Sequence, residues 1–278
     1  MYIALIILVS LLGLFLGYLF LICPEKPSPE ARAVFGGRAY AHRGFYDNRS
    51  EAPENSLPAF ERAMESGYGC ELDVQFTRDK KLIVFHDNDY QRACGDPRPV
   101  WEVDWREARE LKLFNSRERV PLFAEVLAAV DGREPLIIEL KAEGLDTVWY
   151  YELCEAVMAE LDKYKGPCCV ESFHPLVVRW FRKNRPDIVR GQLASSFKSR
   201  DDLPFIKGAA RGALICNVLS RPHFAAFKES ETGAPFKLLR RLGGLGVVWT
   251  VKSEARHREL LDKTDAIIFE GYAPESRF

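Results

Sequence analysis

The sequence predicts an α/β fold, a (β/α)8 barrel preceded by one transmembrane helix. Three observations support this prediction. An uncharged apolar run fills the N-terminus from Tyr2 to Cys23. From Ala39 onward, short apolar runs alternate with amphipathic runs, which is typical of a parallel sheet covered by helices. The roughly 250 residues after the apolar run match the size of one barrel domain.

Residues 1–23 are predicted to be a transmembrane anchor that places the protein at a membrane. As a helix, this run would span roughly 33 Å, enough to cross the hydrocarbon layer. A cleavable signal peptide is the alternative. It is disfavoured because no Lys or Arg precedes the run and no small-residue cleavage site follows it. Lys26, Arg32 and Arg38 come after the run, so the positive-inside tendency predicts a cytoplasmic main domain.

The remaining chain is predicted to form one domain. Residues 24–37 contain several prolines and glycines and are expected to be a linker, and residues 38–278 the barrel. The net charge of −1 argues against a broad basic surface, so nucleic acid is not an expected partner. The seven cysteines match no zinc or redox motif, which favours free thiols in a reducing compartment. No protein partner can be named from the sequence.

Nine segments have the composition of strands, one more than a barrel of this kind holds. In order they are Ala39–His42, Cys70–Gln75, Leu82–His86, Leu136–Leu140, Cys168–Ser172, Val189–Leu193, Leu214–Cys216, Val247–Val251 and Ala266–Phe269. One of the two weakest, around Gln192 or Ile215, is expected to be extra. Segments with helical spacing lie between them: Ser56–Gly67, Trp105–Leu113, Leu122–Val130, Asp146–Leu161, Pro175–Asn184, Arg221–Glu229 and Glu254–Leu261.

The second of these strands carries paired carboxylates. Glu71, Asp73 and Gln75 share one face because side chains two apart in a strand point the same way. Carboxylates that face the inside of a barrel repel each other and lose hydration unless a cation compensates them. Oxygen ligands favour Mg²⁺ or Ca²⁺. The alternative, a solvated strand with a polar face, is disfavoured by the apolar residues that alternate with the acids.

The strand at Leu136–Leu140 repeats this pattern. Glu139 and Lys141 share one face of an otherwise apolar segment. Glu139 is a candidate third metal ligand, and Lys141 at the strand end could hold a phosphate oxygen. A salt bridge that closes a core strand is the alternative, and for this segment taken alone it is favoured.

Two histidines follow strand-like runs. His42 and His86 each end a candidate strand, and the C-terminal ends of barrel strands meet at one rim, where active sites are built. Both are therefore expected to converge with the carboxylates. Arg43 follows His42, and its planar fork suits a phosphate group. No serine-nucleophile elbow, catalytic cysteine motif or glycine-rich nucleotide loop competes with this interpretation.

At these residues the chain resembles the glycerophosphodiester phosphodiesterase (GDPD) family, in particular its membrane-anchored bacterial type. The resemblance covers essentially everything after the anchor. The matching motifs are Ala41-His42-Arg43-Gly44, Pro53-Glu54-Asn55-Ser56, Glu71-Leu72-Asp73-Val74, His86-Asp87, Ile138-Glu139-Leu140-Lys141, Glu171-Ser172-Phe173, Trp249-Thr250-Val251 and Asp265-Ala266-Ile267-Ile268. Compared with the family pattern, Ser56 replaces Thr, Lys252 replaces Asn and Glu270 replaces Asp.

The resemblance implies a TIM barrel of the phospholipase-C-like phosphodiesterase type. It implies a hydrolase of lipid metabolism that cleaves glycerophosphodiesters to glycerol 3-phosphate and an alcohol. It further implies these roles: metal ligands Glu71, Asp73 and Glu139 for one divalent cation, Mg²⁺ or Ca²⁺; acid–base residues His42 and His86; phosphate contacts Arg43 and Lys141; and a substrate pocket at Phe173 and Trp249. The attacking oxygen is either water or the neighbouring glycerol hydroxyl.

Two other functions remain open from the sequence. The first is hydrolysis of membrane lysophospholipids in the manner of a lysophospholipase D, because the anchor would hold the barrel near lipid. The second is a catalytically inactive protein that binds lipid head groups. The presence of both histidines and all three carboxylates argues against the second.

Overall fold

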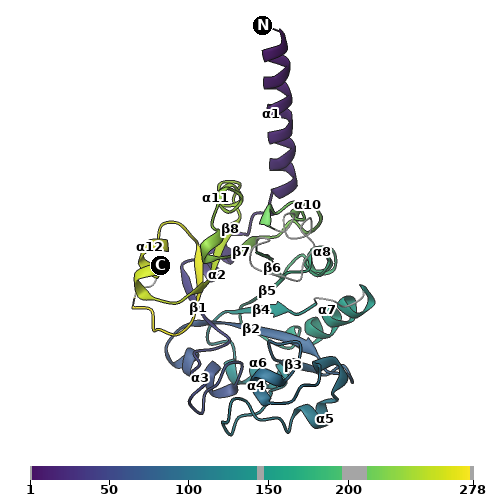
Figure 1. The fold of residues 1–278 in the computed structure, drawn as a ribbon, viewed down its shortest axis with the longest axis vertical. Helices are drawn as coiled ribbons and strands as arrows, with labels where there is room; N and C mark the ends of the chain where they lie inside the picture. The colour runs from purple at the N-terminus through teal and green to yellow at the C-terminus, as the bar shows by residue number, and fades with distance from the viewer. Residues whose placement is uncertain (1, 143–146, 196–211, 276–278) are drawn as a thin grey trace.

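A closed parallel barrel forms the centre of the protein (Figure 1). The computed structural model describes residues 2–142, 147–195 and 212–275. The barrel strands run in the order β1-β9-β8-β7-β6-β5-β4-β2, and pairing of β1 with β2 closes the ring. Their bounds are β1 Arg38–His42, β2 Gly69–Phe76, β4 Leu136–Leu140, β5 Cys168–Ser172, β6 Val189–Ala194, β7 Phe224–Lys228, β8 Leu245–Val251 and β9 Ala266–Phe269. The predicted barrel is confirmed.

Helices alternate with these strands along the chain. They are α3 Leu57–Glu65, α6 Phe123–Val130, α7 Thr147–Leu161, α8 Pro175–Asn184, α11 Ala234–Arg241 and α12 Glu254–Leu260, with single turns at α4 Gln91–Cys94, α5 Trp105–Ala108 and α10 Asn217–Ser220. Two 3₁₀ turns lie at Val100–Glu102 and Glu229–Glu231. The predicted helix at Trp105–Leu113 is thus shortened to one turn, and Asp146, the start of another, lies outside the described residues.

Three predicted elements are wrong. The segment Leu82–His86 contributes only β3, Leu82–Val84, which pairs antiparallel to β2 outside the barrel. The connection between β2 and β3 is too short for the crossover that a parallel strand needs. Leu214–Cys216 forms no strand, and Leu214 has a left-handed backbone, so of the two weakest candidates this one is the extra segment while the one around Gln192 is strand β6. The predicted helix Arg221–Glu229 is instead strand β7, because a strand buried on both faces has no alternating pattern to reveal it.

The N-terminal end of the barrel is closed by apolar side chains. Helix α2, Pro29–Phe35, begins at Ser28, whose hydroxyl accepts a hydrogen bond from the backbone of Ala31. The Tyr40 hydroxyl donates to the Phe35 carbonyl at 3.0 Å, so α2 is held beneath β1. Within the barrel, this end is filled by Tyr40, Ile137, Cys169, Phe224, Leu245, Val247 and Ala266. Residues 24–37, predicted as a linker, therefore include a helix that packs on the barrel.

Helix α1, Tyr2–Ile22, projects away from the barrel (Figure 1). Its length and composition suffice for a membrane span, and a signal sequence would have the same properties. Its end is bonded to the barrel. The Glu25 carboxylate lies 2.5 Å from the guanidinium of the buried Arg190 in β6, and the Arg221 guanidinium donates to the Cys23 carbonyl at 2.8 Å. These contacts lie at the N-terminal ends of β6 and β7.

Candidate active site

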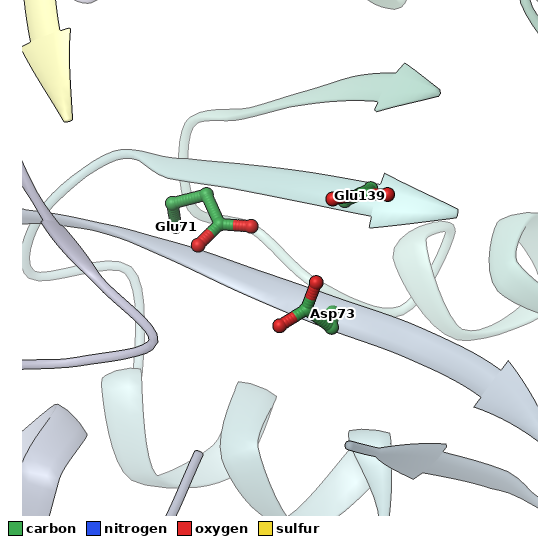
Figure 2. A group of neighbouring side chains, drawn as sticks. All are labelled: Glu71, Asp73 and Glu139. Carbon is green, nitrogen blue, oxygen red and sulfur yellow. The ribbon is translucent and has the colours of Figure 1, made fainter. Parts of the chain in front are cut away.

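Three carboxylates converge inside the C-terminal half of the barrel (Figure 2). Glu71 and Asp73 point inward from β2, and Glu139 points inward from β4, where it pairs in register with Asp73. All three are buried, and a carboxylate oxygen from each lies within 4.8 Å of the others. This geometry follows from the period of two along a strand and from the parallel register of neighbouring strands.

The two carboxylates of β2 have opposite pKa shifts. Burial, followed by repulsion from Asp73 and Glu139, raises the pKa of Glu71 well above its usual value. Burial also opposes ionisation of Asp73, but the positive charges of Lys141 and its neighbours outweigh it and lower the pKa of that carboxyl. Burial and mutual repulsion thus oppose ionisation of Glu71, and a bound cation would favour its ionised form.

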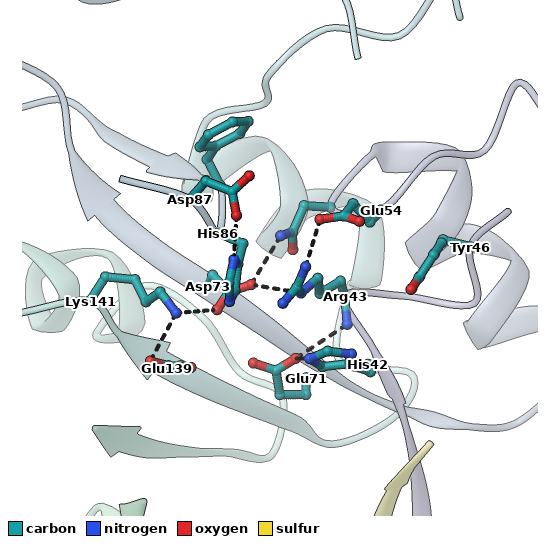
Figure 3. A network of polar contacts seen from close by, with 12 residues as sticks. His42, Arg43, Tyr46, Glu54, Glu71, Asp73, His86, Asp87, Glu139 and Lys141 are labelled. Atoms are coloured by element: carbon teal, nitrogen blue, oxygen red, sulfur yellow. Dashed lines mark hydrogen bonds and ion pairs between the residues drawn. The ribbon is translucent and has the colours of Figure 1, made fainter. Parts of the chain in front are cut away.

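Two cationic side chains border the carboxylates (Figure 3). Lys141 Nζ lies 3.2 Å from Asp73 Oδ1 and 3.1 Å from Glu139 Oε1. The Arg43 guanidinium lies 2.7 Å from Glu54 and 3.6 Å from Asp73, and its backbone N–H donates to Glu71 at 3.2 Å. Arg43 adopts a positive φ, a strained conformation that is common at functional sites.

His42, the last residue of β1, faces the carboxylates of β2. Its Nε2 lies 3.9 Å from Glu71 Oε2, and its Nδ1 lies 2.7 Å from Glu270 Oε2. Glu270 is further bonded by Lys252 at 2.5 Å and by the Tyr46 hydroxyl at 3.2 Å. Two of the three positions that depart from the family pattern, Lys252 and Glu270, are therefore in direct contact behind His42.

His86 faces the same cavity, but the element that positions it differs from the prediction. It lies just beyond the antiparallel β3, so the β2–β3 hairpin, not a barrel strand end, returns it to the level of Asp73. Gln75 fixes this return, because its Nε2 donates to the carbonyls of Phe85 and Asp87 at 2.7 and 2.9 Å. His86 Nδ1 in turn lies 2.7 Å from Asp87 Oδ1.

Both histidines thus have a carboxylate behind Nδ1. Ionised carboxylates only accept hydrogen bonds, so the ring proton lies on Nδ1 and Nε2 is free to exchange a proton with a ligand. Burial lowers the pKa of His42, and burial together with Lys141 lowers the pKa of His86. Neutral rings are therefore favoured near pH 7.

A second arginine connects the outer part of this network. Arg92 contacts Glu54 at 2.6 Å and Asp87 at 2.7 Å, so it joins the partner of Arg43 to the partner of His86. Hydrogen bonds from Arg92, with the nearby charge of Arg43, outweigh burial and lower the pKa of Glu54 to about 2.

Apart from the buried Asp73, these site residues line one cavity of about 780 Å³ at the C-terminal end of the barrel. Phe173 and Trp249, predicted pocket residues, form part of its wall, with ring centroids 6.0 Å apart and nearly perpendicular planes. The structure therefore brings together every site residue that was predicted from the sequence. Their individual roles stay predictions.

Comparison with known proteins supports the same assignment. Residues 42–270 match the model of the glycerophosphoryl diester phosphodiesterase family. The chain belongs to this family. It is 30% identical to a glycerophosphodiester phosphodiesterase of Bacillus altitudinis, over 62% of this chain and 77% of the relative. It is 32% identical to one from Caldanaerobacter subterraneus subsp. tengcongensis, over 55% of this chain and 65% of the relative.

Solved structures share the fold. A glycerophosphodiester phosphodiesterase from Parabacteroides distasonis aligns with a TM-score of 0.67 and 23% identity, covering 84% of this chain and 93% of its own. A phosphodiesterase from Oleispira antarctica, solved with the product sn-glycerol-3-phosphate, aligns with a TM-score of 0.69 and 19% identity, covering 87% and 96%. The predicted family and the predicted enzyme class, a phosphodiesterase of glycerophosphodiesters, are confirmed.

Sequence reasoning assigned no role to five residues of the network: Glu54, Gln75, Asp87, Arg92 and Glu270. Weak signals existed for some of them. Glu54 and Asp87 lie within the matching motifs, and Gln75 shares the inward face of Glu71 and Asp73. The Arg92–Glu54 and Glu270–His42 contacts gave no signal, because their partners lie 38 and 228 residues apart in the sequence.

Proposed function

We propose that this protein hydrolyses glycerophosphodiesters to glycerol 3-phosphate and an alcohol with one divalent cation, Mg²⁺ or Ca²⁺, held by Glu71, Asp73 and Glu139. The carboxylate cluster carries the proposal. Its oxygens are the hard donors that these cations favour. Asp73 Oδ1 is buried, and although Lys141 Nζ lies 3.2 Å away, no group donates a well-aligned hydrogen bond to this oxygen, so it can still coordinate a cation.

The cation, when bound, supplies electrostatic stabilisation of the charge that develops on the phosphoryl oxygens. The chain's own cations extend this stabilisation. Lys141 and Arg43 lie against the same carboxylates, so each can turn a donor toward a phosphate oxygen. Negative partners keep both side chains extended into the cavity before substrate arrives.

His42 and His86 act as the acid–base pair. Each exposes Nε2 to the cavity while a carboxylate fixes Nδ1, the arrangement that orients a catalytic imidazole. One ring removes the proton of the attacking oxygen and the other protonates the departing alkoxide. If that oxygen is the neighbouring glycerol hydroxyl, a cyclic phosphate forms first, and ³¹P NMR of the reaction will detect it.

Helix α1 would hold the enzyme at a membrane as a single-span N-terminal anchor, with the barrel on the cytoplasmic side. Its apolar side chains are exposed along nearly the whole helix, so the folded protein does not bury them. Its end is bonded to the barrel through Glu25 and Arg190. Carbonate extraction of cells that express the full chain will test this: release into the soluble fraction contradicts anchoring.

The activity is tested with the full-length protein in detergent. Glycerophosphocholine is supplied with Mg²⁺ or Ca²⁺, and glycerol 3-phosphate and choline are measured. We expect EDTA to abolish turnover and His42→Ala to lower kcat by about 100- to 10,000-fold. The exposed Glu155→Gln on α7 serves as the control and should match the wild type. EDTA-resistant turnover, or wild-type turnover of His42→Ala, contradicts the mechanism.

A further inference from the structure

The cavity has a second polar region, which begins beside the carboxylate cluster and extends around the barrel. Three of its lining residues carry a buried polar atom that has no hydrogen-bond partner: Glu171 Oε2, Ser195 Oγ and Trp249 Nε1. Glu171 and Ser195 are each 2% exposed. Buried polar groups are nearly always bonded, so unpaired atoms that line one cavity indicate a missing ligand.

These residues lie along one arc of the ring, on β5, at the end of the neighbouring β6, and on β8, which β7 separates from β6. Glu171 pairs in register with Glu139 across β4 and β5, so it lies about 4.8 Å, one strand spacing, beyond the third carboxylate of the cluster. Ser195 follows β6, two residues after Leu193, which also lines the cavity. Trp249 comes from β8 and packs its ring edge-on against Phe173, two residues after Glu171.

We propose that Glu171, Ser195 and Trp249 form a subsite that hydrogen-bonds the terminal hydroxyl of the substrate's glycerol moiety. The atoms suit a hydroxyl, which both donates and accepts: Trp249 Nε1 only donates, a carboxyl oxygen accepts, and the serine does both. The Phe173 and Trp249 rings supply an apolar wall for the carbon chain. The inference rests on the proposed function and adds to it a choice of substrate class.

The subsite selects free glycerophosphodiesters against lysophospholipids. A 1-acyl lysophospholipid carries an ester at the terminal oxygen, so it has no proton to donate to Glu171, and its acyl chain would have to occupy the space around three buried polar atoms. A site that hydrogen-bonds a substrate hydroxyl discriminates strongly against analogues without it, since the buried partners are then left unpaired. The lysophospholipase D alternative is therefore disfavoured.

The test compares glycerophosphocholine with its 1-deoxy analogue, in which a methyl group replaces the terminal CH₂OH but the hydroxyl beside the phosphate ester remains. We expect wild-type kcat/KM to be at least about 100-fold higher for glycerophosphocholine. Glu171→Leu should lower kcat/KM for glycerophosphocholine by about 10- to 100-fold and leave the value for the analogue within about threefold. Glu171→Gln, which keeps hydrogen-bonding atoms, should restore part of the preference.

A second variant keeps the test decisive if Glu171→Leu misfolds. Trp249→Phe keeps an aromatic ring but removes Nε1, and it should reduce the preference for glycerophosphocholine over the 1-deoxy analogue. Trp180→Phe on α8 is the matched control and should leave this preference unchanged. An unchanged preference in both Glu171→Leu and Trp249→Phe overturns the subsite, as does equal turnover of glycerophosphocholine and 1-acyl lysophosphatidylcholine by the wild type. If the wild type with Mg²⁺ or Ca²⁺ cleaves none of these substrates, the proposed function itself fails.

Discussion

The two ends of the barrel are built from the same strands but differ in their chemistry. At the N-terminal end, side chains such as Tyr40 and Ile137 form an apolar layer. Two residues further along β1 and β4, His42 and Glu139 face the same interior and belong to the charged cavity. One step of the strand period therefore separates a layer that stabilises the fold from a layer that binds ligand.

This difference indicates that the charged layer does not stabilise itself: the rest of the barrel holds its residues in place. The layer is rich in unfavourable features: raised carboxyl pKa values, unpaired buried atoms and the positive φ of Arg43 and Asn55. Such features persist only where the surrounding structure over-determines them. Substitutions in the charged layer, at the C-terminal mouth of the barrel, should therefore reduce activity with little loss of stability. Substitutions in the apolar layer, at the closed N-terminal end, should reduce stability with little loss of activity.

The largest effect is expected for Glu71→Gln at the mouth. Loss of a metal ligand should lower kcat/KM by about 100- to 1,000-fold. Because burial and neighbouring carboxylates raise the pKa of Glu71, its neutral replacement should leave the thermal midpoint in EDTA unchanged or higher. Calorimetry in EDTA, with Glu155→Gln as the control, measures this. A clear fall in that midpoint would contradict the separation of the two layers.

The reverse effect is expected for Ile137→Ala at the closed end. Ile137 is 2% exposed, so its truncation should leave a cavity and cost about 2–5 kcal/mol of unfolding free energy. The folded fraction should keep wild-type kcat/KM. Urea unfolding and assays at low temperature test both statements, with Val148→Ala, on the exposed surface of α7, as a control. A large fall in activity per folded molecule would show that the layers are coupled.

A smaller effect on kcat/KM is expected for Glu270→Gln. The Glu270 carboxylate raises the pKa of His42 against the lowering effect of burial. Without that charge the ring loses its proton more easily, so the pKa of His42 should fall further. If His42 is the general base, the acidic limb of the kcat/KM profile should move to lower pH, with about 10- to 100-fold lower activity. A shift to higher pH would falsify this role for Glu270.

The smallest effect is expected for the pH dependence of stability, through His223 near the closed end of the barrel. Burial, followed by the charge of Arg190, lowers the pKa of His223 to about 4 from its ordinary value of 6.5. The folded protein therefore prefers the neutral ring, whose Nδ1 accepts the Arg190 backbone N–H at 3.2 Å. This contribution to stability is complete above pH 6.5 and is lost as the pH falls toward 4.

The thermal midpoint of the wild type should consequently fall over this range by a few degrees more than that of His223→Asn. Differential scanning calorimetry between pH 7 and pH 4.5 provides the comparison. Parallel curves for the two proteins would show that His223 does not titrate on unfolding.

Sequence reasoning identified the features that depend on local pattern. Glu71, Asp73 and Glu139 were found because charges at a period of two stand out in apolar strands. It failed where contacts depend on distant parts of the chain. An apolar run does not reveal its direction, so the sequence predicts a barrel strand at Leu82–His86 although β3 is antiparallel. The apolar residues of β7 show no alternation, so the sequence predicts a helix there. Glu270 lies 228 residues from His42, so no spacing could connect them.

The attachment of α1 has a consequence for how the enzyme meets its substrate. Helix α1 ends at Ile22, and the Glu25 backbone and side chain are already bonded to Pro222 and Arg190. No flexible linker therefore separates helix α1 from the barrel. If α1 crosses a bilayer, the barrel cannot rotate freely relative to the lipid surface. The active-site cavity then keeps a fixed distance from the membrane and a fixed orientation. Substrate must then arrive by diffusion, and turnover should depend on its concentration in the surrounding water and not on the composition of the bilayer.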